Sequence, residues 1–150
     1  MDTLSVQYGK DNDMQCYFEI MTEPQGKERP RFSGRGERIY TPPKTVAFEL
    51  KVISVFREQC PNVYFEQGVP VKATICAGYK IPASASNKKK GDMTNGFIRP
   101  TKKPDTDNLA KAVLDALNGV AYYDDAQVVD LRVIKVYREK PKIMVTLQNE

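Results

Sequence analysis

The sequence predicts a single α+β domain built on one mixed β-sheet, with the element order β-α-β-α-β-β. Alternating apolar and polar positions mark four strands, and two longer segments carry apolar residues at helical spacing. With 150 residues the chain is long enough for one domain with a hydrophobic core. It contains neither an internal repeat nor a linker that would divide it, so we treat residues 1–150 as one domain.

The first half of the chain supplies one strand and one helix. Residues 1–14 are polar and irregular, and we expect them to form a loose extension. Alternation predicts a strand over 15–21. A helix is predicted over 44–59, because Pro42 and Pro43 introduce it and Pro61 stops it. The apolar residues of this helix cover more than half of its circumference, which indicates a second covering surface such as a partner subunit.

The second half supplies three further strands. Alternation over 69–79 predicts the second strand, and residues 80–104 form a loop long enough to indicate function or mobility. A strand is predicted over 128–137, with a bulge near Val133 because the apolar phase shifts there. The strand at 142–148 is predicted to complete a hairpin with it.

The second helix is predicted from Asp107 to Leu117. Pro104, Asp105 and Thr106 favour a helix start, while Asn118 and Gly119 are typical of a helix end. One face is apolar and should pack, and it comprises Leu109, Ala112, Val113, Ala116 and Leu117. The opposite face carries Asp107, Lys111 and Asp115 at intervals of four residues, and it is therefore free for chemistry.

Four aspartates gather around this helix, although the chain as a whole has a net charge of +4. They are Asp105, Asp107, Asp124 and Asp125. The helix is roughly 16 Å long, and the residues from Leu117 to Asp125 can span up to roughly 26 Å when extended. Chain length therefore permits Asp125 to return along the helix to Asp105 and Asp107, which would form a cluster of three carboxylates.

Such a cluster indicates a divalent metal ion, because neighbouring carboxylates repel one another unless a cation neutralises them. Mg²⁺ and Mn²⁺ favour carboxylate, water and phosphate oxygens, and in phosphodiester hydrolysis they activate water and stabilise the developing charge. Lys111 lies one turn after Asp107 and is placed to support phosphate charge. The chain has no histidine, which excludes an imidazole base, a histidine zinc ligand and a Ser-His-Asp triad.

Each of these residues also has a purely structural interpretation. Asp105 and Asp107 can cap the helix, Asp107 and Lys111 can form a surface ion pair, and Asp124 and Asp125 are common turn residues. Taken one at a time, these structural roles are more common than catalytic ones. The metal hypothesis therefore depends on the combination of residues.

Basic residues concentrate in the segments 27–44 and 80–103, which together hold thirteen of the 23 lysines and arginines. Loops rich in cations and glycine are suited to a phosphate backbone, so these segments favour a nucleic-acid partner. The residues that we expect to contact DNA are Lys27, Arg29, Arg31, Arg35, Lys88, Lys89, Lys90, Lys102 and Lys103. For the run from Lys88 to Lys90 a solvated charge run is an equally good interpretation.

Composition excludes several other classes of protein. No apolar run is long enough to cross a membrane, and charged residues between Asp2 and Asp13 exclude a signal peptide, so we expect a cytoplasmic location. The three cysteines, Cys16, Cys60 and Cys76, match neither a disulfide framework nor a zinc pattern. We expect them to be buried as small apolar residues.

The combined motifs resemble the RusA family of Holliday junction resolvases, endonucleases of bacteria and their phages. The segments that carry the resemblance are KPDTDNLAKAVLDALNG and YYDDAQVVDLRV, together with the upstream RPR at 29–31 and YTP-x-KT at 40–45. Where some members carry an arginine run before the first aspartate, this chain has 101-TKKP-104.

The resemblance implies a RusA-like, homodimeric, Mg²⁺-dependent endonuclease, with Mn²⁺ as an alternative ion, that resolves four-way DNA junctions in recombination and repair. It matches Asp105, Asp107 and Asp125 to metal-binding catalytic aspartates, Lys111 to a catalytic lysine and Asp124 to a neighbouring acid. A two-fold dimer presents two sites for paired cuts in two strands. The alternatives are a non-catalytic protein that binds branched DNA and an enzyme acting on a small phosphorylated substrate. The second lacks support, because the chain has no glycine-rich phosphate loop.

Overall fold

The computed structural model describes residues 6–8, 13–34 and 38–150, and residues 1–5, 9–12 and 35–37 lie outside this description. Its elements are β1 (Val6–Tyr8), β2 (Met14–Ile20), β3 (Arg31–Phe32), β4 (Ile39–Tyr40), α1 (Pro43–Gln59), β5 (Val71–Lys80), α2 (Asn87–Thr94), α3 (Thr106–Leu117), the 3-10 turn η1 (Asp125–Gln127), β6 (Val128–Arg138) and β7 (Lys142–Asn149). The predicted mixed α+β domain is confirmed, and the structure adds β1, the β3–β4 hairpin and α2.

The main sheet has the strand order β1-β2-β7-β5-β6, with β5 and β6 parallel and all other neighbours antiparallel. β7 is central, although it comes last of the strands in the chain. The predicted hairpin between the last two strands is wrong, because β5 lies between β6 and β7. The alternating residues of β5 from Val71 to Tyr79 are buried, and a strand buried in this way gains by pairing on both edges.

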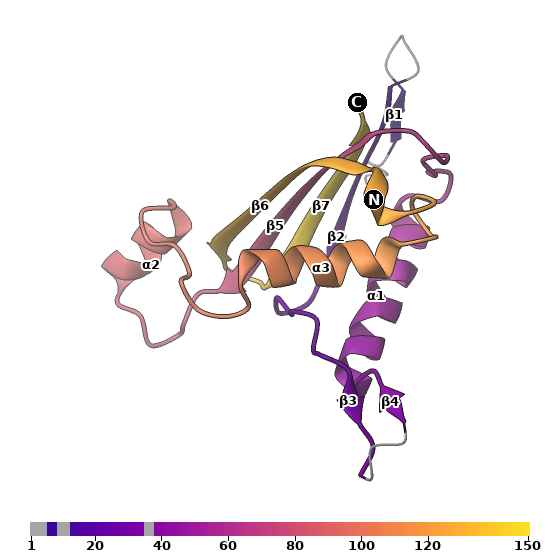
Figure 1. Cartoon of the computed structure of the whole chain (residues 1–150). Helices are drawn as coiled ribbons and strands as arrows, with labels where there is room; N and C mark the ends of the chain where they lie inside the picture. Colours follow the sequence, from indigo (N-terminus) through magenta and orange to yellow (C-terminus); the bar gives the residue numbers. More distant parts are fainter. Residues whose placement is uncertain (1–5, 9–12, 35–37) are drawn as a thin grey trace.

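Helices α1 and α3 cover one face of the main sheet (Figure 1). Phe18 of β2 packs edge-to-face against Phe56 of α1, with ring centroids 5.3 Å apart. Leu109 of α3 packs against Ala77 and Tyr79 of β5. In Figure 1, α3 runs from the ends of β5 and β6 toward α1, so its two ends lie over different parts of the sheet.

Helix α1 begins within one residue of its predicted start, because Pro43 is compatible with the first turn of a helix. Its buried stripe comprises Thr45, Phe48, Val52 and Phe56, which recur at helical spacing. Val46 and Leu50 lie outside this stripe and are 40% and 62% exposed, respectively. Part of the wide apolar surface predicted for this helix is therefore uncovered within one chain.

Three details differ from the sequence-based expectations. The register irregularity of β6 lies at Val129, opposite Val71 and Lys72, rather than near Val133. Val6–Tyr8 pairs with β2, so the expected loose extension at 1–14 is at least partly ordered in the sheet. The expected loop at 80–104 contains α2, whose N-cap Ser86 accepts a hydrogen bond from the backbone N–H of Lys89.

The cysteines are largely buried, as the sequence predicted. Cys16 and Cys60 are buried, Cys76 is half-buried, and all three are free thiols. No helix in the described part of the chain combines the length and the hydropathy that crossing a bilayer requires.

Candidate functional site

An open cleft of about 610 Å³ separates α3 from the segment that leads from β2 to β3. Its lining residues are Lys27, Glu28, Arg29, Pro30, Asp105, Asp107, Asn108, Lys111 and Asp115. A second hollow of about 530 Å³ shares four of these residues and continues past Lys44, Lys103 and Pro104. The cleft therefore places the free face of α3 opposite the first basic segment of the sequence.

The N-terminal end of α3 presents two exposed carboxylates to this cleft. Asp105 is the N-cap residue of α3, yet its side chain makes no capping hydrogen bond. Asp107 follows in the first turn, where a negative charge also complements the helix dipole. No described residue forms a hydrogen bond or an ion pair with either carboxylate. The carboxylate oxygens of Asp105 and Asp107 are therefore available to a ligand.

Lys111 lies one turn further along the same wall of the cleft. Its side chain is exposed, and within the described residues no acid pairs with it. Asp107 and Lys111 form no salt bridge with each other, so the structure does not contain the surface ion pair that the sequence also allowed. An uncompensated ammonium group in an open cleft suits an anionic ligand.

The basic segment approaches α3 closely because Gly26 has no side chain. A Cβ atom at Gly26 would lie 2.1 Å from Asn108 Nδ2 and 3.1 Å from Pro104 Cβ. The backbone N–H of Lys27 donates to Asn108 Oδ1 at 3.1 Å, and the backbone N–H of Glu28 donates to the buried Thr45 hydroxyl at 3.2 Å. These bonds hold the wall of the cleft that carries Arg29.

Lys27 forms an internal ion pair at the C-terminal end of α3. Its Nζ lies 2.6 Å from Asp115 Oδ2 and 3.5 Å from Glu49 Oε1, so it joins α3 to α1. The hydrogen bond with Asp115 raises the pKa of Lys27, although partial burial opposes the shift. Lys27 was predicted to bind DNA, but here its charge is offset by two acids of the same chain.

Asp125 lies at this same end of α3. Its backbone N–H donates to the side-chain oxygen of Asn118, the C-cap residue of α3, at 3.2 Å. Burial raises the pKa of the Asp125 carboxyl, and the neighbouring Asp124 and Asp115 raise it further. The pair formed by Asp115 and Asp125 therefore carries like-charge repulsion that Lys27 only partly offsets.

Asp124 has a structural role in the turn that precedes β6. Its side chain accepts from the backbone N–H of Ala126 at 3.0 Å, and its own N–H donates to Gln127 Oε1 at 2.9 Å, which is a capping box. Gln127 Nε2 also donates to the carbonyl of Glu66 at 2.7 Å. The predicted turn role of Asp124 is confirmed, and its predicted role beside a metal stays a prediction.

The expected meeting of Asp125 with Asp105 and Asp107 does not occur in this structure. The two groups lie at opposite ends of a twelve-residue helix, which is about 18 Å long. Across the described ranges, no group of three or more aspartate, glutamate, cysteine or histidine side chains is arranged to hold a metal ion. The carboxylates fit a hard divalent cation by chemistry, since Mg²⁺ commonly takes one or two carboxylates plus substrate phosphate.

The other predicted DNA-binding residues lie in three places. Arg29 lines the cleft, and Arg31 pairs with Glu28 at 3.3 Å in an exposed ion pair. Lys88, Lys89 and Lys90 lie in α2, which stands away from the body of the domain (Figure 1). Lys102 and Lys103 are exposed just before α3, and Arg35 lies outside the described residues.

Three residues of this region were not identified as site residues from the sequence. Asp115 was placed on the free face of the helix, but its pairing with Lys27 joins positions 88 residues apart and leaves no local signal. Asn118 was interpreted as a helix-end residue, which it is, but its side chain also positions Asp125. Gln127 also anchors the acidic turn, because its side chain donates to the carbonyls of Phe65, Glu66 and Val69. Only its place three residues after Asp124 indicated a structural role.

Comparison with known proteins gives one family. The model of the family described as endodeoxyribonuclease RusA matches residues 22–148. The uncharacterised protein YqaN of Bacillus subtilis (strain 168) is 39% identical over 140 residues, which cover 90% of this chain and 97% of that protein. The crossover junction endodeoxyribonuclease rusA of Lactococcus phage r1t is 34% identical over 88 residues, which cover 58% of this chain and 60% of the phage protein.

Proposed function

This chain belongs to the RusA family of endodeoxyribonucleases, and on that basis we propose that it resolves four-way DNA junctions by paired, metal-dependent nicking. The observation that carries the proposal is the cleft beside α3. Asp105, Asp107 and Lys111 share one wall of it without partners in the described chain, and a basic segment forms the other wall. Free carboxylates and free cations in one cleft suit a phosphodiester.

We propose that Asp105 and Asp107 hold the metal ion. Asp125, with Asp124 as a neighbouring acid, is proposed as a further metal-binding and catalytic acid on the basis of the family resemblance, although it lies at the other end of α3 in this structure. Mg²⁺ is the proposed ion and Mn²⁺ an alternative, because carboxylate and phosphate oxygens suit both. In phosphodiester hydrolysis a divalent ion supplies activation of water and neutralisation of charge on the phosphate. Because no three of these acids meet in the described chain, phosphate and water oxygens would complete the coordination.

Lys111 is proposed to stabilise the negative charge that develops on the phosphate during cleavage. Its ammonium group is exposed in the cleft, one turn from Asp107, and needs no partner to be displaced before it meets a phosphate oxygen. A fixed cation beside a reacting phosphate acts by electrostatic stabilisation. For this role Lys111 needs only its positive charge and its position beside the phosphate.

DNA binding is proposed for the cations around the cleft and for α2. Arg29 and Arg31 extend one wall, Lys102 and Lys103 precede α3, and Lys88, Lys89 and Lys90 lie on α2 beyond the sheet. Lys27 would join them after release from Asp115, and Arg35 belongs to the same segment. Contacts of this kind recognise the backbone and the shape of DNA rather than its sequence.

A homodimer is proposed because resolution needs cuts in two strands of a nearly symmetric junction. The exposed apolar residues Val46 and Leu50 of α1 support a partner surface. Phe32 and Ile39 are each 67% exposed, and the β3–β4 hairpin that carries them lies near the N-terminal end of α1 (Figure 1). Apolar side chains exposed at neighbouring positions commonly mark an interaction surface.

A nicking assay on four-way, three-way and linear duplex DNA tests the proposal. Wild-type protein with Mg²⁺ should cut the four-way junction preferentially, and EDTA should abolish cutting. Asp107→Asn should lose cleavage but bind the junction as well as wild type or more tightly, because it removes charge repulsion with phosphate. Asp130→Asn is the matched control, since Asp130 pairs with Lys72 in the sheet at 3.7 Å, away from the cleft.

The same assay separates the proposed nuclease from a non-catalytic protein that binds branched DNA. Tight junction binding without Mg²⁺-dependent cutting by the wild type would favour the binding protein. Undiminished cutting by Asp107→Asn would remove α3 from the catalytic site.

A further inference from the structure

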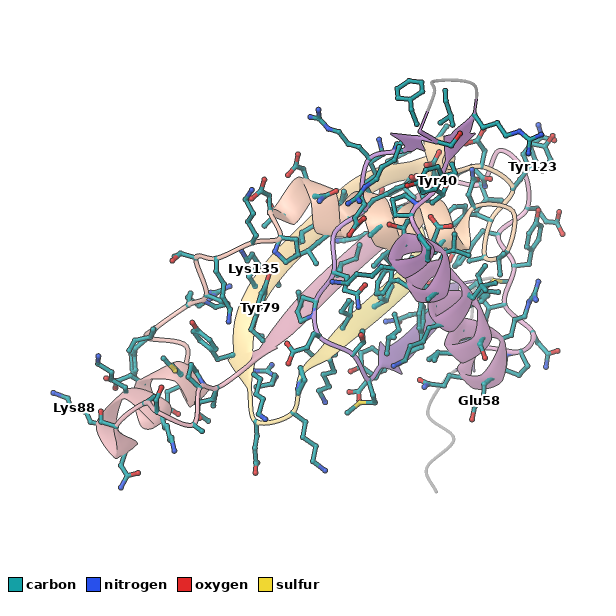
Figure 2. All side chains as sticks on the ribbon, turned by 90° about the horizontal axis from the view of Figure 1, so that it is seen from below. Tyr40, Glu58, Tyr79, Lys88, Tyr123 and Lys135 are labelled. Atoms are coloured by element: carbon teal, nitrogen blue, oxygen red, sulfur yellow. The ribbon has the colours of Figure 1, made fainter. Side chains whose placement is uncertain are left out.

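Tyr79, close to the end of β5, lies beneath two lysines that approach from different parts of the chain. Tyr79 is buried, with only 3% of the residue exposed. The Nζ atoms of Lys102 and Lys135 lie 5.6 Å and 5.3 Å from the ring centroid. Figure 2 shows Tyr79 and Lys135 next to each other over the β5–β6 part of the sheet. Both distances fall within the range of a cation–π interaction.

Hydrogen bonds hold this group together. The hydroxyl of Tyr79 donates to the carbonyl of Pro104 at 3.1 Å, and Lys135 Nζ donates to the carbonyl of Lys102. Arg99 Nε donates to the carbonyl of Lys135 at 2.7 Å. The segment 99–104 is therefore tied to β5 and β6 through the same residues that carry the charges. The ammonium groups are held in place without a carboxylate.

The charge of this group is not balanced. In the parts of the chain that the structure describes, Lys102, Lys135 and Arg99 form no ion pair, whereas Lys27, Lys72 and Lys142 each pair with an acid. The two Nζ atoms lie at most about 11 Å apart, because each is within 5.6 Å of the same centroid. Because Lys135 Nζ also bonds the backbone carbonyl of Lys102, the two lysines belong to one small patch, and unpaired cations in one patch suit an anionic ligand.

We propose that Lys102 and Lys135, positioned by Tyr79, form a second phosphate-binding subsite that takes the phosphodiester next to the one at Asp105 and Lys111. The proposal rests on the nuclease function proposed above and adds Lys135 and Tyr79 to the DNA-binding surface. The subsite adjoins the cleft because Pro104, which accepts from Tyr79, directly precedes Asp105. In addition, burial raises the pKa of Tyr79 and the nearby charge of Asp105 raises it further.

The chemistry selects a phosphodiester rather than a base or a protein carboxylate. Lysine recognises phosphate as a point charge and reads no base sequence. The ring of Tyr79 is buried, so it cannot serve as a stacking surface for a base. The subsite therefore orients a strand along the cleft and leaves sequence preference unchanged.

Fluorescence anisotropy with a labelled four-way junction tests the subsite, with EDTA present to prevent cutting and several KCl concentrations. Lys135→Gln and Lys102→Gln should each weaken junction binding roughly fivefold at 0.1 M salt. Each should also reduce the slope of log K for binding against log salt concentration by about one. Lys135→Arg keeps the charge, so its junction affinity and its salt dependence should match those of wild type. Lys72→Gln is the matched control on the neighbouring strand, and it should stay within about twofold of wild type. Thermal melting of each variant checks folding.

Tyr79→Leu provides an independent variant, because it removes the ring but keeps an apolar side chain. It should weaken binding while Tyr79→Phe, which keeps the ring, stays closer to wild type. The subsite is overturned if both lysine variants match Lys72→Gln in affinity and salt slope, or if wild type does not bind the junction. It is also overturned if they change the oligomeric state instead, since the cations would then face a second copy. A wild type that binds DNA with these effects but never cuts it contradicts the proposed function and leaves the subsite standing.

Discussion

The two ends of α3 carry the same residue type in opposite circumstances. At the N-terminal end, Asp105 and Asp107 are exposed, and their carboxylates form no hydrogen bond or ion pair with any described residue. At the C-terminal end, Asp115 is bonded to Lys27, and Asp125 is half-buried against it. The first pair is available to a ligand, whereas the second pair is already part of the architecture. A count of aspartates in the sequence does not distinguish the two situations.

The largest expected effect is on cleavage. Asp105→Asn should lower the nicking rate at least about 100-fold, because several kcal/mol of charge stabilisation depend on the ligand set. The family resemblance predicts a similar loss for Asp125→Asn, although Asp125 lies at the other end of the helix. Single-turnover nicking rates measure both, and Asp115→Asn should lose less. Normal cleavage by Asp125→Asn would restrict the site to the N-terminal end.

A smaller effect is expected on stability, and it should appear at the C-terminal end alone. Lys27→Met should lower the free energy of unfolding by about 1–2 kcal/mol, because it leaves Asp115 and Glu49 without their counter-ion. Lys111→Met, the control at an exposed position, should change it by less than about 0.5 kcal/mol. Urea denaturation measures both. Equal losses would mean that the pairing of Lys27 contributes nothing specific.

Metal binding should stabilise the folded protein through the N-terminal end. At ten times its dissociation constant, Mg²⁺ should raise the melting temperature of wild type by about 3–6 °C. Asp105→Asn should show a smaller rise, and differential scanning fluorimetry with CaCl₂ and KCl controls measures the difference. The same rise in both proteins would argue against Asp105 as a ligand.

The smallest expected effect is a pH dependence at the C-terminal end. The folded-state pKa of Asp125 is raised, so its charged form is disfavoured by folding, and stability falls as the pH rises through that value. Asp125→Asn should therefore be more stable than wild type at pH 7 by about 0.5 kcal/mol. The gain should vanish at a pH below the unfolded pKa, where wild type is also neutral. A gain that persists in acid would assign the effect to packing rather than to charge.

The helices that carry the site were predictable because their signals are local. Proline, asparagine and glycine at the termini of α1 and α3 place the boundaries within a residue or so. Helix α2 was missed because it contains Gly91 and three lysines, buries little apart from Met93 and so lacks apolar periodicity. Its N-cap, Ser86, was the one signal in the sequence.

The strand order and the position of Asp125 were not predictable from local signals. The chain between Leu117 and Asp125 is long enough for Asp125 to reach Asp105, but its length does not determine in which direction the chain runs after α3. The direction is set by buried contacts, among them the hydroxyl of Tyr122, which donates to the carbonyl of Leu114 at 2.6 Å. Together with Gln127, this contact keeps the acidic turn at the C-terminal end of α3.

The central place of β7 has a consequence for how the protein is made. While a ribosome synthesises the chain, β2 and β5 both appear before the strand that must lie between them. Two strands that lack their common neighbour cannot complete the sheet beneath α1 and α3. The cleft should therefore form only after residues 142–149 have emerged from the ribosome.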